Sequence, residues 1–119
     1  MQFARIKSVH ELEQALAQAK AQGKPVMLDF YADWCVSCKE MEKLTFTDSR
    51  IRPKLGALVL LQADVTANSD DDKSLLKRFN LFGPPGIIIF DVNSTETGRV
   101  IGFEKAELFD QSLSRYIKS

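Results

Sequence analysis

Cysteine and histidine are scarce in this chain of 119 residues, which contains two cysteines and one histidine. Two cysteines do not make the disulfide framework of a small secreted protein, and a chain of this length can build a hydrophobic core without one. A zinc site needs four ligands, and the only histidine, His10, lies in a different predicted element from the cysteines. The sequence therefore predicts one domain over residues 1–119 and no metal site.

The charge and hydropathy patterns exclude further classes of protein. The chain has 16 basic and 16 acidic residues, and this zero net charge argues against a nucleic-acid-binding protein. No apolar run approaches the roughly 20 residues of a membrane span, and residues 1–5 lack the apolar region of a signal peptide. The chain as written is expected to be soluble, not inserted in a membrane, and monomeric. A fragment cut from a longer exported or membrane-bound protein would have the same features.

The two cysteines, Cys35 and Cys38, lie three residues apart, shortly after the apolar run 26–31. The run predicts a buried strand and the residues after it predict a helix, so the pair lies where a strand leads into a helix. Unpaired N–H groups at a helix start favour a thiolate at Cys35, and Cys38 follows one turn later on the same face. This spacing suits dithiol–disulfide exchange, in which one thiolate attacks a disulfide and the second thiol resolves the mixed disulfide.

Three other interpretations of the cysteine pair are weaker. A structural disulfide would close a loop too short to constrain the unfolded chain much. Half of a zinc site lacks its remaining ligands, and two buried core cysteines fit poorly with the polar neighbours Asp33, Ser37 and Lys39. The sequence favours a redox-active Cys35–Cys38 disulfide that works without any other cofactor.

Strands and helices are predicted to alternate along the chain. Strands are predicted at residues 3–7, 26–31, 57–61, 87–90 and 99–103. Helices are predicted at residues 8–22, 35–44, 51–55, 69–79 and 105–117. The acidic run 70–72 is predicted to be a helix start rather than a metal site. The remaining aromatic side chains are predicted to lie in the core: Phe79, Phe82, Phe90 and Phe109.

This order of elements, with Trp-Cys-x-x-Cys after the first long strand and a proline before a hairpin, resembles the thioredoxin fold. Residues 31–46 (YADWCVSCKEMEKLTF) and 60–68 (LLQADVTAN) are further similar to the C-terminal domains of the DsbD family of thiol:disulfide interchange proteins. The resemblance implies an α/β thioredoxin fold with a central mixed β-sheet flanked by helices on both faces. It also implies a protein-disulfide reductase in the periplasm, part of an inner-membrane protein. Such a domain relays electrons from a membrane-embedded domain to the N-terminal domain of the same protein.

The resemblance also implies roles for single residues. Cys35 corresponds to the exposed nucleophile and Cys38 to the resolving thiol. Pro85 corresponds to the cis-proline that faces the dithiol. Asp29 corresponds to the buried acid of thioredoxins, and Glu42 to an acidic neighbour typical of the DsbD domain.

A surface for partner proteins is predicted around the dithiol, made by Tyr31, Trp34, Pro84, Pro85 and Gly102. Tyr31 and Trp34 flank the cysteines, and their rings serve equally well for partner contact or for plain packing. The chain departs from the family pattern at Pro84 and Gly86, where an apolar residue and a threonine are usual. Because Pro84 has no N–H, it cannot donate a backbone hydrogen bond to an extended partner.

Two carboxylates can also be interpreted without the family. Asp29 lies within an apolar strand, where an unpaired charge is costly, so it is expected to be partly neutral or hydrogen-bonded. It is predicted to exchange a proton with Cys38, and the alternative is a carboxylate satisfied by a lysine such as Lys39. Glu42 follows Cys38 by four residues on the same helical face. Glu42 either affects the pKa of the group that holds this proton or is a solvated residue of the helix.

The charges near the cysteines favour a reductant. Acidic residues outnumber basic ones there, and negative neighbours raise the pKa of a thiol, so Cys35 is not expected to be a very acidic thiol. This places the pair near the ~−270 mV of thioredoxin rather than the ~−120 mV of strong oxidants. Two alternatives remain: a free-standing thioredoxin-like reductase, and a redox-inactive binding module that uses the surface around Pro85.

Overall fold

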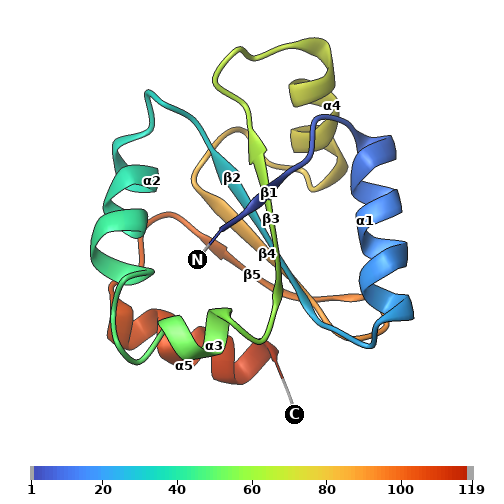
Figure 1. Ribbon diagram of the computed structural model, residues 1–119. Coiled ribbons are helices and arrows are strands. Elements are labelled where there is room, and N and C mark those ends of the chain that lie inside the picture. The colour runs from blue at the N-terminus through green and yellow to red at the C-terminus, as the bar shows by residue number, and fades with distance from the viewer. Residues whose placement is uncertain (1, 118–119) are drawn as a thin grey trace.

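The computed structural model describes residues 2–117 and contains a five-stranded sheet with helices on both faces (Figure 1). The elements are β1 (Ala4–Arg5), α1 (Val9–Ala21), β2 (Val26–Tyr31), α2 (Val36–Glu40), η1 (Met41–Thr45), α3 (Arg52–Leu55), β3 (Val59–Asp64), α4 (Asp70–Arg78), β4 (Gly86–Phe90), β5 (Glu96–Ile101) and α5 (Ala106–Tyr116). The predicted domain also includes Met1, Lys118 and Ser119, which lie outside the described residues. None of the helices described is long and apolar enough to cross a membrane.

The sheet has the strand order β1-β3-β2-β4-β5, with β2 at its centre. β2 runs parallel to β3 and antiparallel to β4, and the outer strands β1 and β5 pair with β3 and β4 respectively. The sheet is therefore mixed, as predicted. The carboxyl end of the central strand leads directly into the segment that carries the two cysteines.

The sheet separates two hydrophobic cores because side chains alternate between its faces along each strand. Val26, Leu28 and Phe30 of β2 pack with α1 and α4, whereas Met27 packs with η1, α3 and α5. Figure 1 shows the corresponding layers, with α1 and α4 on one side of the sheet and α2, α3 and α5 on the other. The predicted α/β architecture is confirmed.

Four of the five strands have bounds that differ from the prediction: β1 is shorter, at Ala4–Arg5 instead of 3–7, β4 begins one residue earlier, at Gly86, and β3 and β5 differ most. β3 spans Val59–Asp64 instead of 57–61, because its pairing with β2 continues through Gln62 and Asp64. β5 begins at Glu96 instead of residue 99, because the hairpin turn is tighter than expected. In this turn the Asp91 N–H donates to the Thr95 carbonyl at 2.9 Å.

Phe82 does not lie in the core, so that prediction is wrong. Its side chain is fully exposed, whereas Phe79, Phe90 and Phe109 are buried as predicted. After α4 ends, Leu81 turns inward and packs against the core that contains α4. The next side chain, Phe82, faces solvent.

The helix predicted at 35–44 is divided into α2 and a π-helical turn, η1. The backbone N–H of Phe46 donates to the carbonyl of Met41, five residues earlier, at 2.9 Å. Two contacts attach η1 to the segment before α5: the Thr45 hydroxyl donates to the Glu104 carbonyl at 2.7 Å, and the Glu104 N–H donates to the Met41 sulfur at 3.3 Å. The end of this helix farther from the cysteines is therefore held in place.

Candidate active site

Cys35 and Cys38 form a disulfide at the start of α2, with their Cα atoms 5.3 Å apart. Cys35 is the N-cap residue, and its sulfur accepts the backbone N–H of Cys38 at 3.1 Å. The same N–H would stabilise a thiolate on Cys35 after reduction. Cys35 is 6% exposed and Cys38 3%, so the exposure expected for Cys35 is not seen while its sulfur is bonded to the buried Cys38.

The backbone behind Cys38 connects the dithiol to the proline loop. The Cys38 sulfur lies 3.7 Å from the carbonyl oxygen of Phe30, and Phe30 pairs with Gly86 across β2 and β4. Pro85 directly precedes Gly86, and its carbonyl accepts the N–H of Gly102 at 3.4 Å. The structure therefore brings Pro85 and Gly102 together beside the strand that supports Cys38.

The proline loop has the cis bond that the sequence predicted and, at Gly102, a conformation that it did not. The peptide bond between Pro84 and Pro85 is cis. Gly102 has a φ of +85°, a left-handed conformation that favours glycine. Pro84 and Pro85 are half-buried and the neighbouring Phe82 is exposed, so this loop presents apolar surface to solvent. Sequence reasoning missed Phe82 as part of that surface.

The two aromatic residues beside the dithiol differ in exposure. Trp34 is 60% exposed, although its indole N–H donates to the carbonyl of Thr66 at 3.1 Å. Tyr31 is buried, and its hydroxyl donates to Asp33 at 3.0 Å and accepts from Lys39 at 3.2 Å. Trp34 therefore has a free apolar face, whereas Tyr31 is held by its neighbours. The hydrogen bond that Asp29 accepts comes from Gln62 and not from Lys39.

Asp29 is buried in the middle of β2, and the Gln62 side-chain N–H donates to its Oδ2 at 3.0 Å. Burial raises the pKa of Asp29 from 3.8 to about 7, partly opposed by the Gln62 hydrogen bond. The charge of Glu42 raises this pKa further and that of Arg5 lowers it. Both protonation states are thus populated near neutral pH, which suits a group that accepts and returns a proton.

Sequence reasoning missed Gln62 and Arg5. Arg5, Gln62 and Asp29 are direct neighbours across β1, β3 and β2, so their side chains lie on one face of the sheet. The Arg5 Nε donates to the Gln62 Oε1 at 2.7 Å. The available signal was the polar residue Gln62 after the apolar run of β3, but the register that brings it to Asp29 is not visible in a single sequence.

Glu42 lies on η1 and is exposed. It is close enough to Asp29 for its charge to raise the pKa of that buried acid. The predicted four-residue helical spacing from Cys38 is interrupted, because the π-helical turn begins at Met41, between the two residues. Glu42 is therefore placed to act on Asp29, while its predicted effect on Cys38 stays a prediction.

A strand-to-helix dithiol, a buried acid behind it and a cis-proline loop beside it together define a thioredoxin-like site. A family model described as thioredoxin-like matches residues 6–92, and the chain belongs to this family. Structures of true thioredoxins have the same fold: that of Thermus thermophilus matches 95% of this chain and 85% of its own length, with a TM-score of 0.71 and 24% identity.

Within this family, the chain is similar to one particular protein. It is 62% identical over 114 residues to the thiol:disulfide interchange protein DsbD of Ralstonia nicotianae, matching 95% of this chain and 19% of that protein. For DsbD of Escherichia coli (strain K12) the identity is 53% over 115 residues, or 95% of this chain and 20% of that protein. The chain thus spans about a fifth of the length of these curated relatives.

A solved structure identifies the corresponding part of DsbD. The oxidised C-terminal domain of Neisseria meningitidis DsbD matches with a TM-score of 0.82 and 36% identity, over 98% of this chain and 99% of that one. The reduced form of the same domain matches with a TM-score of 0.81. The resemblance to DsbD C-terminal domains that the sequence predicted is confirmed.

Proposed function

We propose that this chain is a protein-disulfide reductase that relays electrons through Cys35 and Cys38. The observation that carries the proposal is the Cys35–Cys38 disulfide at the start of α2, where the Cys35 sulfur accepts a backbone N–H. Its likeness over 98% of its length to a DsbD C-terminal domain supports the same use of the pair. The disulfide itself serves as the redox group, without another cofactor.

The likeness to DsbD also supports a place in a longer electron path. The chain receives electrons from a membrane-embedded domain and passes them to an N-terminal domain of the same protein. In this proposal it works in the periplasm as one domain of an inner-membrane protein. Its partners are then other thiol or disulfide domains.

In the proposed reaction the partner gains two electrons from the dithiol and two protons, one from solvent and one from Cys38 by way of Asp29. The Cys35 thiolate attacks one sulfur of a partner disulfide, which forms a mixed disulfide and releases the other partner sulfur as a thiolate that takes up a proton. Asp29 accepts the proton of Cys38. The Cys38 thiolate then attacks the Cys35 sulfur, which closes the Cys35–Cys38 disulfide and releases the second partner sulfur, again protonated.

The partner is proposed to contact the apolar surface formed by Trp34, Phe82, Pro84, Pro85 and Gly102. Trp34 and Phe82 are the most exposed of these side chains. Because Pro84 cannot donate a backbone hydrogen bond, we expect apolar contact to contribute more to docking here than strand pairing at that position.

The assignment of the two cysteines can be tested by trapping. With a disulfide-containing partner such as insulin, Cys38→Ala should accumulate a mixed disulfide through Cys35, and Cys35→Ala should not. Alkylation of the reduced protein near neutral pH should modify Cys35 faster than Cys38. The reverse pattern would contradict the roles, and absence of any insulin reduction by the wild-type chain would favour a binding module.

The role of Asp29 can be tested by separating the two steps in stopped-flow experiments from about pH 6 to about pH 9. Asp29→Asn should slow resolution of the mixed disulfide by about 10²-fold while leaving the first attack by Cys35 nearly unchanged. Glu42→Gln is the matched control and should have a smaller effect on resolution. Resolution at the wild-type rate in Asp29→Asn would show that Asp29 has a structural role only.

A further inference from the structure

A directional chain of hydrogen bonds joins the edge of the sheet to Asp29. The Arg5 Nε donates to the Gln62 Oε1 at 2.7 Å, and the Gln62 Nε2 donates to the Asp29 Oδ2 at 3.0 Å. We propose that Arg5 is a positioning residue: it fixes the orientation of the Gln62 carboxamide so that an N–H group, and not an oxygen, faces Asp29. This inference rests on the proposed role of Asp29 as the proton acceptor.

The orientation follows from the chemistry of the three side chains. A guanidinium group only donates hydrogen bonds, so the end of the Gln62 carboxamide that faces Arg5 has to be the oxygen. The NH₂ end then faces Asp29 and favours the ionised carboxylate. With the carboxamide reversed, its oxygen would face Asp29 and favour the protonated acid. Arg5 therefore determines whether Gln62 lowers or raises the pKa of Asp29.

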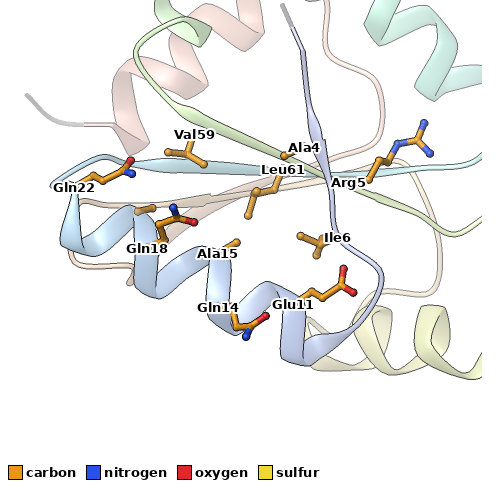
Figure 2. A pocket seen from close by; sticks show the side chains of 11 residues that line it. Ala4, Arg5, Ile6, Glu11, Gln14, Ala15, Gln18, Gln22, Val59 and Leu61 are labelled. Atoms are coloured by element: carbon orange, nitrogen blue, oxygen red, sulfur yellow. The ribbon is translucent and has the colours of Figure 1, made fainter.

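Arg5 is itself held on the correct side of the sheet. In Figure 2 its side chain points away from α1, whereas Ile6 and Leu61 point toward that helix. The Arg5 guanidinium forms an ion pair with Asp64 at 2.9 Å. Asp64 accepts the backbone N–H of Thr66 at 2.9 Å, and its pKa is lowered because the Thr66 hydrogen bonds and the charge of Arg5 outweigh partial burial. The ion pair thus persists in its charged form over the pH range in which Asp29 titrates.

Thr66 connects this ion pair to the loop that carries the dithiol. Its hydroxyl donates to Asp64 and accepts the backbone N–H of Asp33, and its carbonyl accepts the indole N–H of Trp34. The hydrogen bonds therefore run from the loop before Cys35 through Arg5 to the buried acid. No buried side-chain nitrogen or oxygen in residues 2–117 lacks a hydrogen-bond partner.

Several groups around Asp29 contribute to its titration. Glu42 on η1 raises the pKa of Asp29. Arg5 on β1 lowers it in two ways, directly by its charge and, in this proposal, indirectly through the orientation of Gln62. Ile87, the neighbour on β4, is apolar. A test has to separate the charge of Arg5 from its control of the Gln62 carboxamide.

The experiment is a carbon-13 NMR titration of the Asp29 carboxyl group in the oxidised chain. Arg5→Met should raise the titration midpoint by about one pH unit. Arg5→Lys keeps a charged group that only donates hydrogen bonds, so its midpoint should lie much closer to the wild-type value than that of Arg5→Met. Arg50→Met removes an exposed guanidinium that pairs with Asp48 and should leave the midpoint unchanged.

A double-mutant cycle decides between the two effects of Arg5. If Arg5 acts through Gln62, Arg5→Met in a Gln62→Met background should shift the midpoint by less than half as much as in the wild-type background. The proposal would be overturned if the shift in the Gln62→Met background were at least half as large as the shift in the wild-type background. It would also be overturned if Arg5→Met did not raise the midpoint in the wild-type background. Arg5 is exposed, and methionine has nearly the same shape and volume as the glutamine it replaces at the buried position 62, so these variants are expected to fold.

The titration is independent of the proposed function, because it is measured in the disulfide form and without a partner. If Asp29→Asn resolves mixed disulfides at the wild-type rate, the proton-acceptor role fails, but the effect of Arg5 on the carboxamide can still be measured. If Asp29 is the proton acceptor and Arg5 orients Gln62, Arg5→Met should also move the pH profile of mixed-disulfide resolution to higher pH.

Discussion

Replacing Asp29 with asparagine should stabilise the folded protein at neutral and alkaline pH. The carboxylate is buried in the central strand, and its only direct hydrogen bond described above comes from Gln62. Asparagine has nearly the same shape and can accept the same hydrogen bond, but it has no charge to desolvate. The substitution therefore removes the cost of burying the ionised form.

The size of the effect follows from the pKa of Asp29, which is about 7 in the folded protein against an ordinary value of 3.8 that we take for the unfolded chain. One pH unit corresponds to about 1.4 kcal/mol, so the ionised carboxylate lowers the free energy of unfolding by roughly 4 kcal/mol above pH 7. Below about pH 4 the acid is protonated in both states and has no such effect. The loss of stability develops as the pH rises between these limits.

Urea unfolding of the oxidised wild type and of Asp29→Asn, from about pH 4 to about pH 8, measures this difference. The variant should be close to the wild type at the acidic end and more stable by roughly 4 kcal/mol at the alkaline end. Glu40→Gln removes an exposed carboxylate from α2 and should change the free energy of unfolding by less than about 0.5 kcal/mol throughout. A difference for Asp29→Asn that does not depend on pH would refute the raised pKa.

Two further predictions concern packing, and urea unfolding measures both. Thr45→Val removes the hydrogen bond from the buried Thr45 hydroxyl to the half-buried Glu104 carbonyl and should lower the free energy of unfolding by about 1–3 kcal/mol, whereas Thr47→Val, at an exposed hydroxyl, should cost less than about 1 kcal/mol. Gly98→Ala places a Cβ against the Tyr116 ring and should cost about 1–3 kcal/mol, whereas Gly83→Ala has open space and should cost less than about 0.5 kcal/mol. Equal losses within either pair would contradict the contact described.

The parts of the site that could be predicted from the sequence are local. Cys35 and Cys38 could be placed at a helix start because an apolar strand and a helical pattern adjoin them in the chain. The conformation of the Pro84–Pro85 bond and the mixed sheet could be predicted because the order of elements resembles a known fold. These features depend on neighbouring residues or on the overall pattern.

The parts that could not be predicted depend on contacts between distant segments. Arg5 and Gln62 are 57 residues apart, and only the register of β1 and β3 brings them together. The exposure of Phe82 depends on which neighbour turns inward after α4, and the sequence offered Leu81 and Phe82 as equally apolar choices. The extension of β3 to Asp64 has the same origin, because its polar residues find partners on other strands.

The attachment of η1 affects what happens when the disulfide opens. Thr45 and Met41 tie the far end of the helix to the segment before α5, and the disulfide closes its near end. Reduction breaks the covalent link at the near end only, so we expect the first turn to become more mobile while residues 41–46 stay in place. We expect amide hydrogen exchange to quicken in residues 35–40 on reduction and to stay slow in residues 41–46. The movement that accompanies electron transfer would then be confined to the first turn of the helix.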